Sequence, residues 1–333
     1  MEAQQVRQTV VQRENDPYIY LYVMGEWYCY DPHGTPIGSG AMGDVYMGYR
    51  VKNGEQIAIK RVKDFYANTQ LIRERAKQEA SLAFRHPNLV EMIGYCEYAP
   101  DRGPIFLLSH LVKGQNINTY IKSLAGAPFR VEKISRVIMS ILDALDYVHS
   151  RGVIHRDIKP ANIMIEDNSN VRLMDLGISR LSGGNKFSSF GFIGTPQYSA
   201  PEQIKRDESG KGDPINATTD IYEVGITFYE MLTGVNPMDS PSEAEILDRQ
   251  VRKPLPSHQM IPPRLMKVIW KATEKEQAKR YQSALDFKKA IADALAPEPP
   301  VTKKIALWVS EHAVIAGAAA VVIAAVIITL LLI

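Results

Sequence analysis

The sequence contains few cysteines, and their arrangement excludes two common ways of stabilising a fold. Cys29 and Cys96 are the two thiols among 333 residues. They form neither a disulfide framework nor a metal-binding cluster, and they fit a reducing compartment. Hydrophobic residues make up 45% of the chain and charged residues 23%, values that are typical of an ordinary globular core.

An excess of charge of either sign is also absent. The chain has 39 Lys and Arg against 37 Asp and Glu, which gives a formal net charge of +2. No run of Lys or Arg stands out in the body of the chain, so composition gives no reason to expect nucleic acid as a partner. The first residues lack the apolar segment of a secretory signal peptide, and we find no internal repeat.

One long uncharged hydrophobic run is present, at the C-terminal end. Residues 313–333 carry no charge, and Thr329 is the one plainly polar residue among them. At about 1.5 Å per residue this helix would be about 31 Å long, which matches the hydrocarbon core of a bilayer. Lys303 and Lys304 in the preceding linker (residues 296–312) put that side in the cytoplasm by the positive-inside bias. We therefore expect a single-pass C-terminal membrane anchor; a buried core helix is the alternative.

The rest of the chain divides into a strand-rich part and a helix-rich part. Alternating apolar residues and the Asn53-Gly54 turn are typical of a hairpin, whereas the apolar residues of 132–149 follow a helical period. The expected strands lie in 37–63, near 89–97 and 104–112, and the expected helices in 69–84, 132–149, 215–234 and 262–295. Residues 1–30 form an N-terminal extension, in which the aromatic-rich segment 18–30 predicts two short strands. These strands could serve as a docking surface, but packing on the domain that follows is favoured, because exposed apolar patches of that size are rare.

A glycine-rich segment is the first candidate binding motif. Gly38, Gly40 and Gly43 fit a pattern that also occurs in dinucleotide-binding turns, where it follows a strand and opens a helix. Here the chain continues as a strand after Gly43, which argues against a dinucleotide-dependent oxidoreductase. Lys60 on the next strand needs a charged partner if it is buried, and Glu79 on the following helix is a candidate. Each of these charges taken alone is better explained as a solvated side chain.

The most specific signal comes from three motifs in the second half of the chain. Residues 155–162 read HRDIKPAN, residues 175–177 read DLG, and residues 199–202 read SAPE. Two acidic groups and an amide at this spacing, on loops after a helix, could hold metal ions and a nucleophile together. With the glycine-rich loop and the lysine, these motifs make residues 31–295 resemble the eukaryotic-type (Hanks-type) Ser/Thr protein kinases, in particular bacterial membrane-anchored members.

This resemblance implies an α+β, bilobal protein-kinase-like fold, with a β-rich N-lobe at about 31–111, an α-helical C-lobe at about 112–295 and the additional C-terminal transmembrane helix. It implies ATP and Mg²⁺, or Mn²⁺, as cofactors. Lys60 would bind the α- and β-phosphates and pair with Glu79. The residues expected to surround the nucleotide are Gly38, Gly40, Gly43, Val45, Ala58, Lys60 and Met164.

The resemblance also assigns catalytic roles. Asp157 would orient the substrate hydroxyl and accept its proton, and Lys159 would steady the γ-phosphate. Asn162 and Asp175 would hold the metal. The physical reason is common to all four residues, because phosphoryl transfer is catalysed mainly by positioning and charge neutralisation. Lys159 is the form found in Ser/Thr kinases, and Thr195 would position the acceptor, so the expected substrates are proteins with Ser or Thr acceptors.

Structural roles and departures follow from the same resemblance. Glu202 and Arg280 match an ion pair of the large lobe, and Asp220 matches an aspartate that supports the catalytic loop. Leu176 replaces the usual Phe of the metal-binding motif, an apolar exchange whose effect on the balance between active and inactive states stays open. Glu223 replaces a residue that is usually small, and the sequence offers no account of it.

Regulation and assembly are further expectations. Arg156 would pair with a phosphate on the activation segment (residues 178–198), whose candidate autophosphorylation sites are Ser182, Ser188, Ser189 and Thr195, with Ser188 or Ser189 favoured. The alternative is a simple flexible loop. Alanines four residues apart in 313–333 would permit a homodimer, or they are ordinary filler. A membrane-tethered ATP-binding scaffold that recruits partners through residues 1–30 is the rival to an active kinase.

Overall fold

The computed structural model describes residues 9–40, 43–67, 70–81, 84–99, 102–123, 130–174, 187–188, 191–192, 195–205 and 212–297, apart from some side chains within these ranges. The chain forms two units, Met1–Ala294 and Leu295–Ile333. The described part of the second unit is limited to residues 295–297, so the fold described below is that of the first unit.

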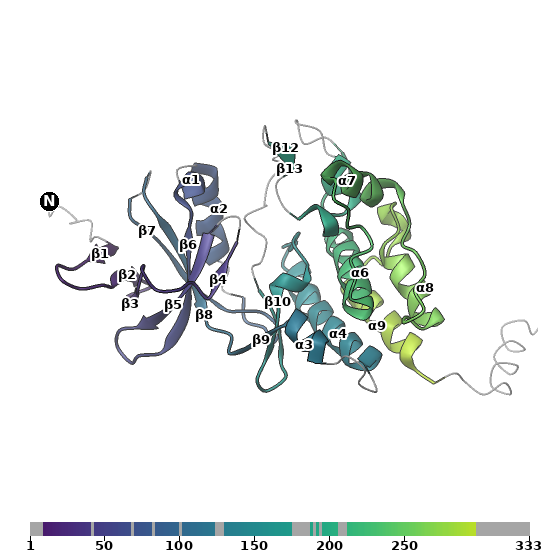
Figure 1. The fold of residues 1–333 in the computed structure, drawn as a ribbon, viewed down its shortest axis with the longest axis horizontal. Coiled ribbons are helices and arrows are strands. Elements are labelled where there is room, and N and C mark those ends of the chain that lie inside the picture. The colour runs from purple at the N-terminus through teal and green to yellow at the C-terminus, as the bar shows by residue number, and fades with distance from the viewer. Residues whose placement is uncertain are drawn as a thin grey trace, which may run out of the picture. The chain divides into compact units, whose positions relative to one another are not determined.

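The small lobe is built on one antiparallel sheet with the strand order β1-β2-β3-β5-β6-β8-β7, in which β4 also pairs with β5 (Figure 1). The strands are β1 (Val10–Gln12), β2 (Ile19–Val23), β3 (Glu26–Tyr30), β4 (Gly38–Ser39), β5 (Gly43–Arg50), β6 (Gln56–Val62), β7 (Met92–Glu97) and β8 (Ile105–His110). Helices α1 (Asp64–Ala67) and α2 (Gln70–Ser81) follow β6, and α2 packs on β7 and β8. The predicted strands in 37–63, 89–97 and 104–112 are confirmed, and so is the helix that precedes His86.

The N-terminal extension belongs to this sheet. Strands β2 and β3 form a hairpin whose turn, Met24-Gly25, has positive φ angles of 49° and 87°. Strand β3 then pairs with the end of β5, where Tyr28 lies opposite Arg50. The start of β5 pairs instead with β4, so one edge of β5 receives two strands that are separated by residues 31–37. The predicted packing of residues 18–30 on the following domain is confirmed.

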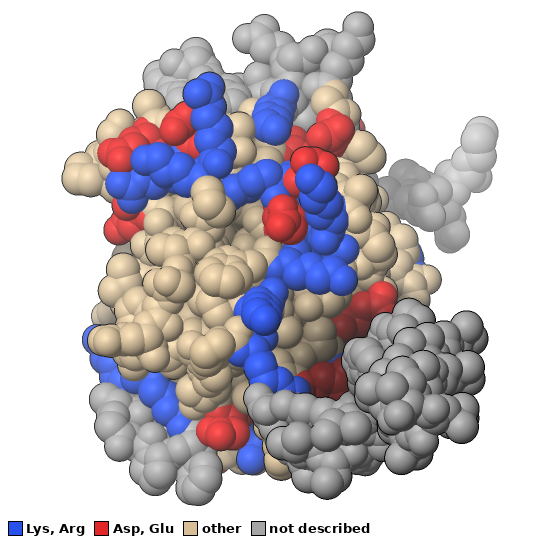
Figure 2. All heavy atoms as spheres, turned by 90° about the vertical axis from the view of Figure 1, so that its right-hand side faces the viewer, with Lys and Arg blue, Asp and Glu red and all other residues tan. Residues whose placement is uncertain are grey.

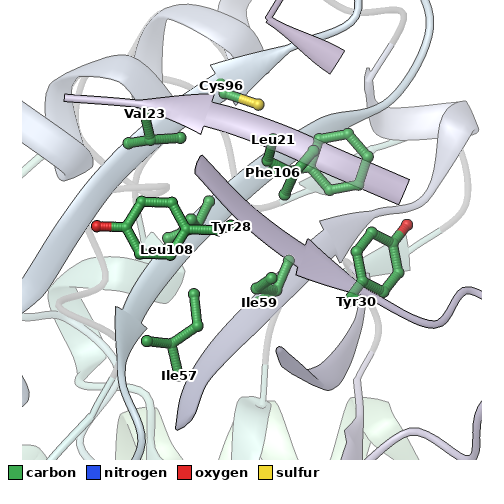
Figure 3. Packing of buried hydrophobic residues seen from close by; sticks show 9 residues of the cluster. All are labelled: Leu21, Val23, Tyr28, Tyr30, Ile57, Ile59, Cys96, Phe106 and Leu108. Carbon is green, nitrogen blue, oxygen red and sulfur yellow. The ribbon is translucent and has the colours of Figure 1, made fainter. Parts of the chain in front are cut away.

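The sheet carries a hydrophobic core on each face, because successive side chains of a strand point to opposite sides. One face packs under α2 through Val62, Ala67, Ala76, Ile105 and Leu107. On the other face, side chains of the extension gather with those of β6, β7 and β8 (Figure 3). This second core consists of Leu21, Val23, Tyr28, Tyr30, Ile57, Ile59, Cys96, Phe106 and Leu108.

The extension also reaches the far edge of the sheet. The hydroxyl of Thr9 donates to the carbonyl of Glu97 in β7 (2.7 Å). Strands β2 and β7 are neighbours, and a Cβ at Gly94 would lie only 2.6 Å from Val23 Cγ1. Glycine at position 94, with its φ of 157°, is therefore what allows the two strands to approach. The extension thus covers the sheet face opposite α2.

The large lobe is mainly helical. Its helices are α3 (Ile117–Ser123), α4 (Arg130–His149), α5 (Pro201–Lys205), α6 (Ala217–Thr233), α7 (Glu243–Arg252), α8 (Pro263–Ala272) and α9 (Ala284–Leu295). The β9 (Gly114–Asn116), β10 (Ile163–Glu166) and β11 (Val171–Leu173) strands form a small sheet, and β12 (Phe187–Ser188) pairs with β13 (Gly191–Phe192). Helix α6 packs between α4 and α8 and is buried over nearly its whole length.

The helix predicted in 132–149 is confirmed as α4. The expected helix in 215–234 is confirmed as α6, which starts at a capping box on Asn216 and ends at Gly234 in the left-handed conformation. The expected helical stretch 262–295 is instead two helices, α8 and α9. The residues between them turn toward α5 and α6, where Arg280 binds Glu202 and the Thr218 carbonyl.

The structure leaves the predicted membrane anchor untested. No helix among the described residues is both long and apolar enough to span a bilayer. Residues 313–333 and nearly all of the linker at 296–312 lie outside the described residues. The anchor stays a prediction.

The second core predicts that the extension stabilises the small lobe. Leu21→Ala should lower the free energy of unfolding by about 2–5 kcal/mol, because Leu21 is fully buried and its truncation leaves a cavity. Denaturant unfolding followed by fluorescence measures this. Met24→Ala is the matched control on the same hairpin; Met24 is 85% exposed and its truncation should change stability by no more than about 0.5 kcal/mol. Equal effects of the two changes would contradict the role of the second core.

Candidate active site

The loop between α4 and β10 carries the predicted catalytic residues. Helix α4 ends at His149, and Gly152 turns the chain with a φ of 75°. The motif at 155–162 follows and closes with a 3₁₀ turn at Pro160–Asn162 that leads directly into β10. Strand β10 pairs with β11 and with β9, and this pairing fixes the C-terminal end of the loop.

Three side chains of this loop meet one from the activation segment. Lys159 Nζ lies 3.1 Å from Asp157 Oδ2 and donates to Thr195 Oγ1 at 2.8 Å. The Asn162 amide donates to the Asp157 carbonyl at 2.8 Å and to its Oδ2 at 3.1 Å. The structure therefore brings together the predicted base, the predicted phosphate-binding lysine, one predicted metal ligand and the predicted acceptor-positioning threonine.

This cluster suits a phosphoryl group and a hard cation. The Asn162 Nδ2 atom is engaged with Asp157, so its other terminal atom, the carbonyl oxygen, is directed elsewhere, and such oxygens are ligands for Mg²⁺. The backbone carbonyl of Asn162 accepts a hydrogen bond from the backbone N–H of Met174 (2.9 Å). This bond holds Met174, the residue before Asp175, beside Asn162. Asp175 itself lies outside the described residues, among which no group of three His, Cys, Asp or Glu could hold a metal. The donors present fit the predicted site.

The predicted nucleotide-binding residues of the small lobe lie on paired strands. Val45 on β5 lies opposite Lys60 on β6, and Ala58 on β6 lies opposite Ser109 on β8. Across the glycine-rich loop, Gly40 N donates to Gly43 O at 2.9 Å. A Cβ at Gly43 would collide with the backbone of Arg61, so this position requires glycine.

The remaining predicted residues are placed only in part. Gly38 is in β4, and Met164 is in β10, where it pairs with Asn116 and Arg172. Glu79 lies in α2 and Ser188 in β12, but their side chains are outside the described part of the structure. The pairing of Lys60 with Glu79 therefore stays a prediction. Ser182 and Ser189 also lie outside the described residues.

Asp220 at the start of α6 binds the backbone of the catalytic loop, which is the loop between α4 and β10. Its buried carboxylate accepts from the backbone N–H of His155 (2.8 Å) and of Arg156 (2.7 Å), and His149 Nε2 lies 2.7 Å away. Burial acts to raise the pKa of Asp220, but the hydrogen bond from His149 and the backbone donors outweigh it and lower the pKa. Arg156 has a φ of 66°, a costly conformation for a non-glycine residue, and the bond to Asp220 helps to hold it.

The predicted ion pair of the large lobe is present. Arg280 binds Glu202 through two bonds of 2.8 and 2.9 Å, and both side chains are fully buried. Thr219 of α6 donates to the same carboxylate at 2.7 Å. The face of the molecule in Figure 2 carries exposed charged side chains of both signs, in contrast to this buried pair. The buried pair joins α5, at the end of the activation segment, to α6 and to the connection before α9.

A second buried network was not predicted from the sequence. The Tyr222 hydroxyl donates to Gln250 Oε1 (2.6 Å), and the Gln250 amide donates to the Pro196 carbonyl (3.1 Å), next to Thr195. Lys275 Nζ donates to the Tyr222 hydroxyl at 2.8 Å. The signal that could have revealed it is the uncharged polar Gln250 four residues after buried Ile246 of α7.

Comparison with known proteins decides the family. Residues 33–295 match the protein kinase domain family. This chain belongs to that family. The kinase is 29% identical to the serine/threonine-protein kinase PknB of Mycobacterium tuberculosis over 296 residues, which cover 86% of this chain and 46% of the relative. It is 32% identical to the probable serine/threonine-protein kinase PknB of Bifidobacterium longum, with coverages of 77% and 38%.

The fold has solved counterparts. The crystal structure of the Mycobacterium tuberculosis PknI kinase domain superposes with a TM-score of 0.59 at 22% identity, and covers 80% of this chain and 96% of that domain. This likeness supports the bilobal kinase fold. The predicted resemblance to bacterial Ser/Thr kinases is confirmed at the level of the family, and the kinase spans less than half the length of the curated relatives named above.

Lys275 predicts a pH dependence of stability. Burial, with the nearby Arg280 charge, lowers the pKa of Lys275 from an ordinary 10.5 to about 7. Between these values the unfolded chain holds more protons than the folded one, so stability should rise with pH from about 7 to 10. After screening by solvent the rise should be roughly 2 kcal/mol.

The measurement is urea unfolding at pH 6 to 10 of the wild type and of Lys275→Met, which should lack this rise. Lys267→Met removes an exposed lysine of α8 and should keep the wild-type profile. Parallel pH profiles for the wild type and Lys275→Met would show that Lys275 keeps its proton in the folded state.

Proposed function

We propose that this chain is an active Ser/Thr protein kinase that transfers the γ-phosphate of ATP to hydroxyls of protein substrates. The observation that carries the proposal is Lys159, which bridges Asp157 and Thr195. A base, a phosphate-binding cation and an acceptor-positioning hydroxyl thus share one hydrogen-bonded cluster. The names of the bacterial relatives support the same activity and the Ser/Thr acceptor class.

The arrangement divides the chemical work among the cluster. Asp157 Oδ2, oriented by the Asn162 amide, is placed to take the proton of the acceptor hydroxyl as its oxygen attacks the γ-phosphorus and ADP leaves. Lys159 offers its ammonium to the negative charge on the transferred oxygens. Mg²⁺ would be held by Asn162 and Asp175, and when bound it neutralises phosphate charge. Lys60 and the glycines of residues 38–43 would hold the remaining phosphates.

Asp157→Asn should reduce phosphorylation of a generic acceptor protein by about 10²- to 10⁴-fold, because an amide cannot accept the proton. The measurement is transfer of labelled phosphate from Mg-ATP, with Asp143→Asn as a control. Asp143 of α4 binds Lys288 of α9 and lies outside the predicted catalytic motifs. Equal labelling by the wild type and Asp157→Asn would favour the ATP-binding scaffold instead.

Autophosphorylation is part of the proposal. Ser182, Ser188, Ser189 and Thr195 are the candidate sites, with Ser188 or Ser189 favoured, and Arg156 would receive the phosphate. The bond between Thr195 and Lys159 supports a positioning role for Thr195. Phosphopeptide mapping of the labelled wild type belongs to the same experiment, and active enzyme without phosphate between residues 175 and 202 would exclude this regulation.

We further propose that residues 313–333 anchor the kinase in a membrane, the inner or plasma membrane of a bacterium, with residues 31–295 on the cytoplasmic side. The support is the uncharged run and the lysines before it. The full chain should stay in the membrane fraction after an alkaline carbonate wash, and deletion of 313–333 should release it. Release of the full chain by the wash would contradict a spanning helix.

A homodimer through the alanines of this segment is a further hypothesis, because small residues four apart let helices approach closely, and alanine as ordinary filler is its alternative. Crosslinking of the full chain in bilayers tests it, and crosslinking that finds monomers alone would remove the idea.

A further inference from the structure

One face of helix α6 lies against the backbone of the catalytic loop. Asp220, Glu223 and Thr227 are spaced three and four residues apart, so they share that face. All three are buried: Asp220 and Thr227 are fully inaccessible, and Glu223 is 1% exposed. Buried polar groups of this kind need partners, and the loop supplies them.

The backbone N–H groups of four consecutive loop residues all end on side-chain acceptors. Those of His155 and Arg156 donate to the two oxygens of Asp220 (2.8 and 2.7 Å), and that of Asp157 donates to His155 Nδ1 (3.3 Å). The fourth, Ile158 N–H, donates to Glu223 Oε2 at 2.8 Å. The carbonyl of Ile158 accepts from Thr227 Oγ1 at 3.2 Å.

Asp157 therefore lies between two peptide groups that buried carboxylates hold. Hydrogen bonds to a carboxylate are about twice as strong as those between neutral groups. Ile158 is fully buried, so its N–H would lose its partner without gaining water if the carboxylate were removed. In the kinases that this sequence resembles the residue at position 223 is small, and a small side chain could not span from α6 to the loop. The unusual glutamate at position 223 therefore makes a specific contact, with the backbone N–H of Ile158.

We propose that Glu223 is a positioning residue of this kinase, whose carboxylate fixes the Ile158 peptide and through it the direction of the Asp157 side chain. The inference rests on the proposed kinase function and adds a determinant of catalytic-loop geometry. A displacement of about 1 Å at a reacting group can cost on the order of 10²-fold in rate. Glu223 should therefore act on kcat, whereas ATP binding depends on other residues.

The test uses the full chain and three changes. Glu223→Ala removes the acceptor, Glu223→Gln keeps an acceptor oxygen of the same reach, and Thr227→Val removes only the hydroxyl that binds the Ile158 carbonyl. Asp143→Ala is the matched control, because it removes a carboxylate of the same lobe that binds Lys288. Thermal melting of each variant identifies any that fail to fold.

Two readouts separate positioning from general stability. The first is kcat and KM for ATP in the labelled-phosphate assay; Glu223→Ala should lose about 10- to 100-fold in kcat with KM within about threefold. Glu223→Gln should recover most of this loss, Thr227→Val should lose less, and Asp143→Ala should keep the wild-type kcat. The second is hydrogen–deuterium exchange of a peptide that covers residues 155–158, which should speed up in Glu223→Ala and not in Asp143→Ala.

The outcomes overturn the inference in distinct ways. Unchanged exchange at 155–158 in Glu223→Ala would show that Glu223 does not hold the loop, whether or not the chain is a kinase. Faster exchange with unchanged kcat would show that the contact does not position Asp157. An inactive wild type with the expected exchange pattern would instead contradict the proposed function and leave the contact to the loop established. If Glu223→Ala does not fold, Glu223→Met replaces it in the test, because it fills the same space without an acceptor for the Ile158 N–H, and an unchanged kcat and exchange in Glu223→Met overturn the proposal.

Discussion

The large lobe depends on buried carboxylates of α6 that accept hydrogen bonds from the backbone of the catalytic loop. Asp220 and Glu223 together accept hydrogen bonds from three backbone N–H groups of this loop, those of His155, Arg156 and Ile158. Such contacts are stable because the acceptors are charged and the donors cannot turn to water. They also let Arg156 keep a left-handed backbone conformation that would otherwise be costly.

The same helix connects the loop to the segment that would bind substrate. Thr219 contacts the Glu202–Arg280 pair, and Tyr222 reaches the Pro196 carbonyl through Gln250. The buried Glu202 and Arg280 charges are matched to each other, since an isolated one would be expensive in a core. Helix α6 is thus a rigid polar support whose packing against α4 and α8 fixes the distances among Asp157, Lys159 and Thr195.

The small lobe meets a different requirement, which is the placement of the strands that carry the predicted nucleotide-binding residues. A hydrophobic core on both sheet faces leaves β5 and β6 little freedom, because burial on either side resists bending. The extension supplies the outer core through Leu21, Val23, Tyr28 and Tyr30. Residues that precede the family match at 33–295 therefore contribute to the stability of the strand that carries Lys60.

The sequence by itself determined the two lobes, most strands and helices, and the cluster of Asp157, Lys159, Asn162 and Thr195. The strands and helices follow from local periodicity, whereas the cluster follows from the resemblance of the sequence motifs to those of the kinase family. Only the tertiary structure decided the contacts of Gln250 and Glu223, the closure of the extension onto β7, and the break between α8 and α9. Those features depend on partners 50 or more residues away, such as Ile158 for Glu223 and Pro196 for Gln250. The periodicity of a helix reveals that a polar residue lies on its buried face, but the packing of the helices determines which backbone group that residue meets.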